Sequence, residues 1–167
     1  MYRISFLFAG ILFLSSCATP YKADGNLGGF GETQLDDNVF SVYFRGNAFI
    51  EQRNVKTYLL YRCAELTLEK GYDYFVIVGA DTEATRGAIV TPGSYSSTTT
   101  GHATAYGNSA YGSAYSSGTY MPAQATPYTK YTSEATIKLF KGVKPHSLAS
   151  SYQAKKLMGY LEVKIQR

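Results

Sequence analysis

The chain has two cysteines, and their surroundings indicate different chemistry for the two thiols. Cys17 follows Leu14, Ser15 and Ser16 at the end of an apolar N-terminal run. Cys63 lies inside a segment with helical periodicity, where a free cysteine usually acts as a small core side chain. A nucleophilic Cys63 would need a cationic and accessible setting, which this pattern does not provide. If Cys17 is consumed by modification, Cys63 can form neither an intramolecular disulfide nor a thiolate metal site.

The residues Leu14-Ser15-Ser16-Cys17 resemble a bacterial lipobox, the motif at which a signal peptide is cut before a cysteine that carries lipid. The apolar run that precedes them is too short for a permanent membrane span, which needs about 20 residues. We therefore expect residues 1–16 to be a signal peptide and Cys17 to be the lipid attachment site. The alternative is an ordinary secretory signal in which the cysteine is incidental.

Acylation of Cys17 would hold the protein on a membrane, because two or three acyl chains make release negligible. Ala18, the next residue, is not the aspartate that commonly retains proteobacterial lipoproteins at the inner membrane. This favours a lipid-anchored protein at the outer membrane, facing the periplasm.

Composition and motifs exclude several functions. The 16 basic and 12 acidic residues give a net charge of +4, and the basic residues are scattered, so no nucleic-acid partner is expected. The sequence contains no HExxH, GxSxG or P-loop motif, and neither His102 nor His146 lies near a candidate nucleophile in the sequence. We predict a protein that is not an enzyme, with no catalytic residue, no metal and no cofactor beyond the covalent lipid on Cys17.

Arg62 and Glu65 are the charged pair most suited to binding. Their spacing of three residues places them together on the narrow polar strip of a predicted helix, with Glu69 one turn further on. A surface ion pair is one interpretation. The other is a groove beside this strip in which the planar guanidinium of Arg62 binds a carboxylate, as in an enzyme acting on envelope material.

The regular elements start with residues 39–45, whose alternation predicts a half-buried strand. A helix is predicted from Glu51 to Lys70, with Gly71 as its stop. Its apolar positions occupy more than one side, so we expect a sheet and a second element to cover it. Residues 74–79 are typical of a central strand buried on both faces. Strand, helix and strand in this order indicate a right-handed βαβ unit.

The second half of the chain supplies a further strand, predicted at residues 131–140. The C-terminus favours a helix, with a strand over 161–165 as the alternative. The apolar face of that helix would contain Ala154, Leu157, Met158, Leu161 and Ile165. The predicted fold class is α+β, with a small sheet of about three or more strands, one largely buried helix and a C-terminal helix.

Two segments differ in composition from this α+β domain, which we place at residues 37–167. Residues 17–36 are polar and glycine-rich, and we interpret most of them as a tether, with Phe30 and Leu35 as small anchors on the domain. Residues 92–128 form a low-complexity insert of Ser, Thr, Gly, Ala and Tyr within the domain.

The insert has two interpretations. It lacks aliphatic core residues, which is typical of a solvated loop. Alternatively it is adhesive, since tyrosine offers a large amphipathic contact at low entropic cost, with Tyr106, Tyr111 and Tyr115 as the binding residues. The partner would then be a glycan or another envelope protein, and a surface adhesin is one form of this hypothesis.

Several short segments carry a family resemblance. They are 19–21, 28–32 with Leu35, 44–47, 59–67 and 71–72. Together they resemble a family of small proteobacterial outer-membrane lipoproteins with a lipobox and a single periplasmic domain. That family brings no established activity, so the resemblance implies location and domain extent only. Alanine is common in the family where Cys63 stands. We therefore expect a cell-envelope lipoprotein with a non-catalytic binding or assembly role.

Overall fold

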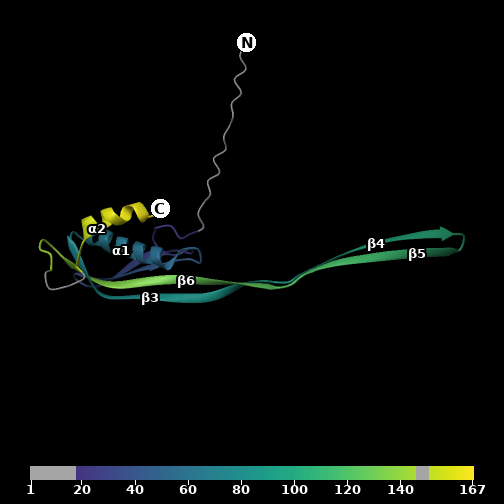
Figure 1. The fold of residues 1–167 in the computed structure, drawn as a ribbon, viewed down its shortest axis with the longest axis horizontal. Helices are drawn as coiled ribbons and strands as arrows, with labels where there is room; N and C mark the ends of the chain where they lie inside the picture. Colours follow the sequence, from purple (N-terminus) through teal and green to yellow (C-terminus); the bar gives the residue numbers. More distant parts are fainter. Residues whose placement is uncertain (1–17, 146–150) are drawn as a thin grey trace, which may run out of the picture. The chain divides into compact units, whose positions relative to one another are not determined.

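The fold is described by a computed structural model of residues 18–145 and 151–167 (Figure 1). The chain divides into two compact units. The first contains the described residues up to Ala84 and those from Lys130 onward, and the second is Thr85–Thr129.

The first unit is built on a five-stranded antiparallel sheet with the strand order β1-β2-β6-β3-β7, of which β3 and β6 also extend into the second unit. The strands are β1 (Gly29–Asp36), β2 (Val39–Arg45), β6 (Gln124–Phe140), β3 (Tyr74–Thr91) and β7 (Ser151–Gln153). Helix α1 (Gln52–Glu69) packs on the sheet, and α2 (Ala154–Leu161) packs on α1 (Figure 1). A 3₁₀ turn, η1 (Glu162–Lys164), follows α2. The α+β prediction is therefore confirmed, although the fold is mainly sheet.

The predicted strands 39–45 and 131–140 are confirmed as β2 and as the second half of β6. The strand predicted at 74–79 also exists, but as β3 it continues to Thr91. Phe75 and Val76 point to opposite faces and are both buried, whereas Val78 is exposed. The prediction that this strand is buried on both faces is therefore correct only at its start.

The expected βαβ unit is present in split form, because β2 and β3 both run antiparallel to the strand between them and are therefore parallel to each other. Strands β2 and β3 are connected through α1, but β6 lies between them in the sheet. β6 pairs antiparallel with β2, from Val39 opposite Lys138 to Arg45 opposite Thr132. The local pattern predicted the order of the elements along the chain, but the inserted neighbour comes from a distant part of the sequence.

Helix α1 is confirmed, and Gly71 follows it with a φ of 78°, a conformation that glycine adopts without strain. The expectation that two layers cover α1 is also confirmed, because the sheet lies on one side and α2 on the other. The C-terminal helix is correct and the alternative strand over 161–165 is wrong. Leu157, Met158, Leu161 and Ile165 pack, partly buried, against the core, and Ala154 is fully buried.

The tether expected at residues 17–36 is not what the structure shows for residues 18–36. Thr19 and Tyr21 are buried, and β1 pairs with β2 from Gly29 opposite Arg45 onward. Phe30 packs against the core as expected, but Leu35 is exposed, so that anchor is wrong. The described chain is folded almost from its first residue.

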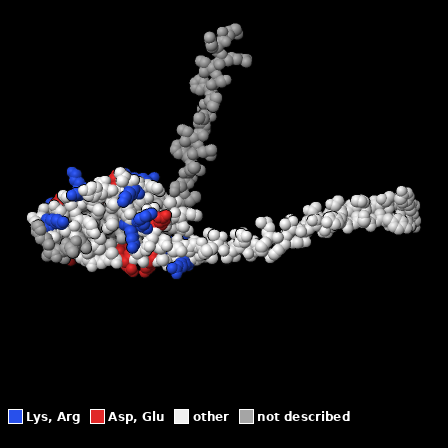
Figure 2. All heavy atoms as spheres, in the orientation of Figure 1, with Lys and Arg blue, Asp and Glu red and all other residues white. Residues whose placement is uncertain are grey.

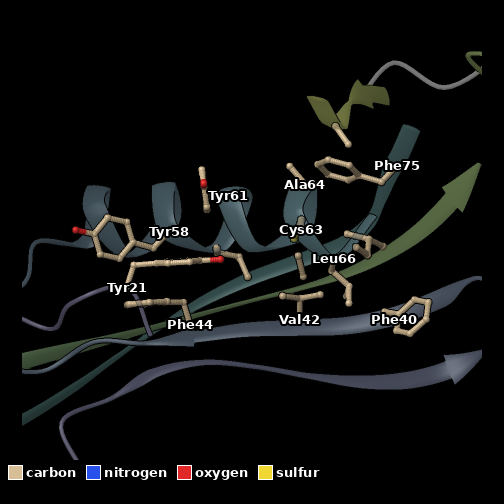
Figure 3. Packing of buried hydrophobic residues seen from close by; sticks show 14 of the residues in the cluster. Tyr21, Phe40, Val42, Phe44, Tyr58, Tyr61, Cys63, Ala64, Leu66 and Phe75 are labelled. Carbon is tan, nitrogen blue, oxygen red and sulfur yellow. The ribbon is translucent and has the colours of Figure 1, made fainter. Parts of the chain in front are cut away.

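Tyr21 explains why this glycine-rich segment folds. Its ring lies parallel to that of Phe44 with the centroids 6.4 Å apart, and it meets Tyr58 and Tyr61 of α1 edge-on at 5.9 and 5.0 Å (Figure 3). Aromatic pairs at such distances add to the free energy gained by burying their apolar area. The segment before β1 therefore supplies a central core residue.

The second unit contains a two-stranded antiparallel sheet of β4 (Ser94–Tyr106) and β5 (Ser109–Met121). The loop interpretation of the insert is therefore wrong over these residues, although every side chain of both strands is exposed. A two-residue turn joins the strands, and Gly107 has a φ of 58°, as the first position of a tight hairpin turn requires. Thr and Tyr favour extended backbone, but the Gly and Ala residues between them do not, so local composition gave no clear prediction of these strands.

Candidate functional site

Arg62 lies under the N-terminal segment and is only 6% exposed, so the polar strip of α1 is covered at this residue, although Glu69 on the same strip is exposed. All five N–H groups of its guanidinium donate hydrogen bonds. Nε and one N–H of Nη2 bond the carboxylate of Glu32, at 3.3 and 2.9 Å. Nη1 bonds Glu65 and Glu69 at 2.6 and 2.9 Å, and Nη2 also bonds Glu69 at 3.0 Å. We call these four residues the Arg62 cluster.

Residues far apart in the sequence build this cluster. Glu65 and Glu69 lie one and two turns along α1, whereas Glu32 comes from β1. The ring of Phe30 packs under the guanidinium at 4.5 Å, and the Tyr21 hydroxyl donates a 2.5 Å hydrogen bond to Glu65. The cluster therefore attaches the N-terminal segment and β1 to α1.

Electrostatics keep Arg62 charged. Burial alone lowers the pKa of the Arg62 guanidinium, but the hydrogen bonds to Glu32, Glu69 and Glu65 reverse this and raise its pKa above the ordinary value. Burial and the bond to Glu65 likewise raise the pKa of the Tyr21 hydroxyl. The cluster thus holds a permanent cation among three carboxylates, with a phenol as a further donor.

The expected pairing of Arg62 with Glu65 is present, but it is not a surface ion pair because Arg62 is buried. The hypothesis that Arg62 binds a ligand carboxylate meets a physical obstacle. Five donors are used by three carboxylates, so none is left for a substrate while the cluster is intact. Sequence spacing identified Glu65 and Glu69, but it gave no signal for Glu32 on a different element.

Cys63 is fully buried in the core between α1 and the sheet, as expected (Figure 3). Burial raises the pKa of its thiol to about 12, so the thiolate is scarce at neutral pH. The prediction that Cys63 acts as a core residue is confirmed.

A surface hollow of about 440 Å³ lies between α1 and β3, and its polar side chains include Lys56 and Asp81. Its lining residues are Gln52, Lys56, Leu59, Leu60, Ile77, Ala80, Asp81, Thr82 and Ala135. In residues 18–145 and 151–167, no group of three or more His, Cys, Asp or Glu could hold a metal ion. None of the helices in this part of the chain is long and apolar enough to cross a membrane.

Tyr106, Tyr111 and Tyr115 share one face of the β4–β5 hairpin. Thr104 pairs with Tyr111, and side chains two residues apart share a face, so Tyr106 and Tyr111 lie on the same side. Tyr115, four residues after Tyr111, lies there as well. We call this side the tyrosine face, and all three of its tyrosines are exposed.

The opposite face of the hairpin is different. Its outer half contains only small residues: Ala105 opposite Ala110, Ala103 opposite Gly112 and Gly101 opposite Ala114. Tyr95 and Tyr120 pair at the other end of the same face. Residues 87–129 contain no Lys, Arg, Asp or Glu, so both faces are without formal charge apart from any protonated His102 (Figure 2).

Two residues singled out by the sequence, Cys17 and His146, lie outside the described residues. His102 lies on the tyrosine face and is exposed. Comparison with protein-family models, curated proteins and solved structures finds no match to this chain.

Proposed function

We propose that this protein is a lipoprotein of the bacterial cell envelope. Acylated Cys17 anchors it at the outer membrane, facing the periplasm, and its role is non-catalytic binding or assembly. The lipobox and the resemblance to small proteobacterial lipoproteins support the anchor. Incorporation of labelled palmitate into the wild type but not into Cys17→Ala is the expected result. Absence of label from the wild type would remove the basis for this location.

The binding role rests on the β4–β5 hairpin. An isolated two-stranded hairpin is only marginally stable in water, and no third strand pairs with it within the described residues. Its thirteen cross-strand pairs are wholly exposed, and three tyrosines are aligned on one face. Tyrosine rings on an exposed, uncharged surface suit stacking on the rings of a glycan.

Peptidoglycan sacculi are a direct probe of this role. The wild type should co-sediment with sacculi, and a variant with residues 93–122 replaced by an Asn-Gly turn should stay in the supernatant. The deletion leaves all residues of the five-stranded sheet and both helices in place, so circular dichroism should show that the first unit remains folded. Equal binding of the two proteins would contradict a binding role for the hairpin.

A surface adhesin is the second candidate, because the same exposed tyrosines would serve it equally. The two candidates differ in which side of the outer membrane the hairpin faces. Protease treatment of intact cells should leave the hairpin uncut if it faces the periplasm. Cleavage between Ser94 and Met121 in intact cells would favour the adhesin.

A further inference from the structure

The chain enters the folded domain at Thr19, and its position there is fixed. The side chain of Thr19 is fully buried. Its hydroxyl donates a 3.0 Å hydrogen bond to the carbonyl of Leu27 and accepts a 2.8 Å bond from the N–H of Asn47. Two residues later, the N–H of Tyr21 donates a 2.7 Å bond to the carbonyl of Gln166. The domain surface beside Thr19 is therefore the part nearest to Cys17.

This geometry leaves almost no chain between lipid and domain. Cys17 precedes Thr19 by two residues, which span at most about 7 Å when fully extended. The polar headgroup layer on each side of a bilayer is itself about 5–7 Å thick. The Cys17 side chain and its glyceryl linker add only a few bonds to this span, so an acyl chain attached to Cys17 keeps the surface beside Thr19 close to the headgroups.

That surface carries large apolar side chains. Leu27, whose carbonyl accepts the Thr19 bond, is 59% exposed, and Phe49 is 69% exposed. Phe49 is close to the same point, because its N–H donates to the side chain of Asn47 at 2.9 Å. Single exposed apolar residues are common on proteins, but these two are next to the place where a lipid would leave the domain.

Cations lie beside them. A surface hollow of about 530 Å³ is lined by Leu27, Arg45, Asn47 and Lys130, together with Gly25, Asn26, Gly28 and Gly46. No acidic residue contributes to this lining, although the carboxylate of Asp24 pairs with the Arg45 guanidinium at 2.9 Å. Arginine and lysine near a membrane attract the phosphates of anionic lipids.

We propose that the surface formed by Leu27, Phe49, Arg45 and Lys130 is the membrane-contact face of this protein and that its partner is a phospholipid surface. Leu27 and Phe49 enter the boundary between headgroups and acyl chains, and the two cations face lipid phosphates. The inference rests on the lipid anchor of the proposed function. The anchor then fixes the orientation of the domain as well as its location.

The chain has no tryptophan, so a single introduced tryptophan reports one site without background. Phe49→Trp places this probe on the proposed face, and Leu27→Trp is a second variant there in case the first fails to fold. Val143→Trp is the matched control. Val143 is 73% exposed and follows β6 at the end of the sheet opposite to Arg45, since Lys138 pairs with Val39 and Thr132 with Arg45.

The chain from Cys17 onward contains every described residue and can be coupled through Cys17 to a maleimide-bearing phospholipid. Cys63 does not compete, because it is fully buried with a raised thiol pKa. The vesicles contain phosphatidylcholine and phosphatidylglycerol with brominated acyl chains, which quench nearby tryptophan. Phe49→Trp and Leu27→Trp should show several-fold stronger quenching than Val143→Trp, with emission shifted to shorter wavelength.

Equal quenching at the three positions, or stronger quenching at Val143→Trp, would overturn the membrane-contact face. Because the lipid is attached chemically, this result does not depend on lipidation in cells. Failure of palmitate labelling would instead remove the proposed function, so the two failures are distinguishable.

Discussion

The backbone N–H of Asn47 donates a 2.8 Å hydrogen bond to Oγ1 of Thr19, which joins the start of the described chain to the segment that follows β2. The same hydroxyl donates to the carbonyl of Leu27. One buried threonine thus satisfies two backbone groups from separate segments, two residues after the expected lipid attachment site.

Thr19→Val should therefore destabilise the fold. Valine has nearly the same shape, but it leaves the N–H of Asn47 and the carbonyl of Leu27 without their partner. Each unsatisfied buried group costs about 1–3 kcal/mol, and the cost here is at the low end because both hydrogen bonds are only partly buried. We expect the free energy of unfolding in urea to fall by about 2 kcal/mol. Thr19→Ser keeps the hydroxyl and should lose clearly less, whereas equal losses for the two variants would show that the hydrogen bonds contribute nothing.

Arg62→Met should destabilise the first unit by about 3 kcal/mol, because it leaves three carboxylates without their common donor. Arg53→Met is the matched control, since Arg53 is exposed and forms a single 3.1 Å pair with Glu51. A surface pair of that kind is worth about 0.5 kcal/mol or less. Urea denaturation of both variants measures the difference. Similar midpoints would mean that the Arg62 cluster does not stabilise the fold.

Gly28→Ala should be strongly destabilising. Gly28 has a φ of 90°, and an added Cβ would overlap the carbonyl oxygen of Arg45. Backbone strain of this kind costs about 1–3 kcal/mol. Gly25→Ala, three residues earlier, is the control, because nothing lies within 4 Å of its added Cβ. Thermal unfolding should give a much lower midpoint for Gly28→Ala only.

The raised pKa of the Cys63 thiol should make the fold less stable at alkaline pH. The thiol has a pKa of about 8.5 in an unfolded chain, but burial raises it to about 12 in the fold. The folded state therefore retains its proton where the unfolded state loses it, so stability is fully present below about pH 8.5 and falls as the pH rises toward 12. Cys63→Ala should remove the part of this loss between about pH 8.5 and 10.

Tyr61 contributes to the same alkaline loss at higher pH. Burial and its hydrogen bond to Glu162 raise the pKa of its hydroxyl from about 10 to about 12. Cys63→Ala should therefore still lose stability above about pH 10. Urea midpoints of the wild type and of Cys63→Ala, measured across this pH range, test this prediction. Identical pH profiles for the two proteins would contradict the assignment of the loss to Cys63.

The tyrosine face should carry glycan binding. Replacing Tyr106, Tyr111 and Tyr115 together with serine should abolish co-sedimentation with peptidoglycan sacculi. Tyr95→Ser with Tyr120→Ser changes two tyrosines on the opposite face and should leave binding intact. If both sets of substitutions reduce sedimentation equally, the tyrosines act through hairpin stability rather than through one face.

Local sequence patterns predicted the helices and strands whose conformation is set by residues close together in the sequence. The alternation in β2, the stop at Gly71 and the apolar face of α2 each depend on a short stretch, and each is found in the structure. The insertion of β6 between β2 and β3 depends on a partner from a distant part of the chain, which periodicity does not encode.

The N-terminal segment shows why composition misled the prediction. Its glycines indicated a flexible tether, but Gly28 and Gly29 adopt positive φ values that direct the chain into β1. Tyr21 and Thr19 then supply the buried contacts. Only part of the Arg62 cluster could be predicted from the sequence. Glu65 and Glu69 share a helix face with Arg62, so their spacing indicates the contact, whereas Glu32 comes from a different element.

The intact mass of the protein purified from membranes tests the central claim most directly. We predict a chain that begins at Cys17, lacks residues 1–16 and carries a diacylglyceryl group with a further acyl chain. A chain that retains residues 1–16, or one that begins at Cys17 with an unmodified thiol, would contradict the lipid anchor and the membrane orientation derived from it.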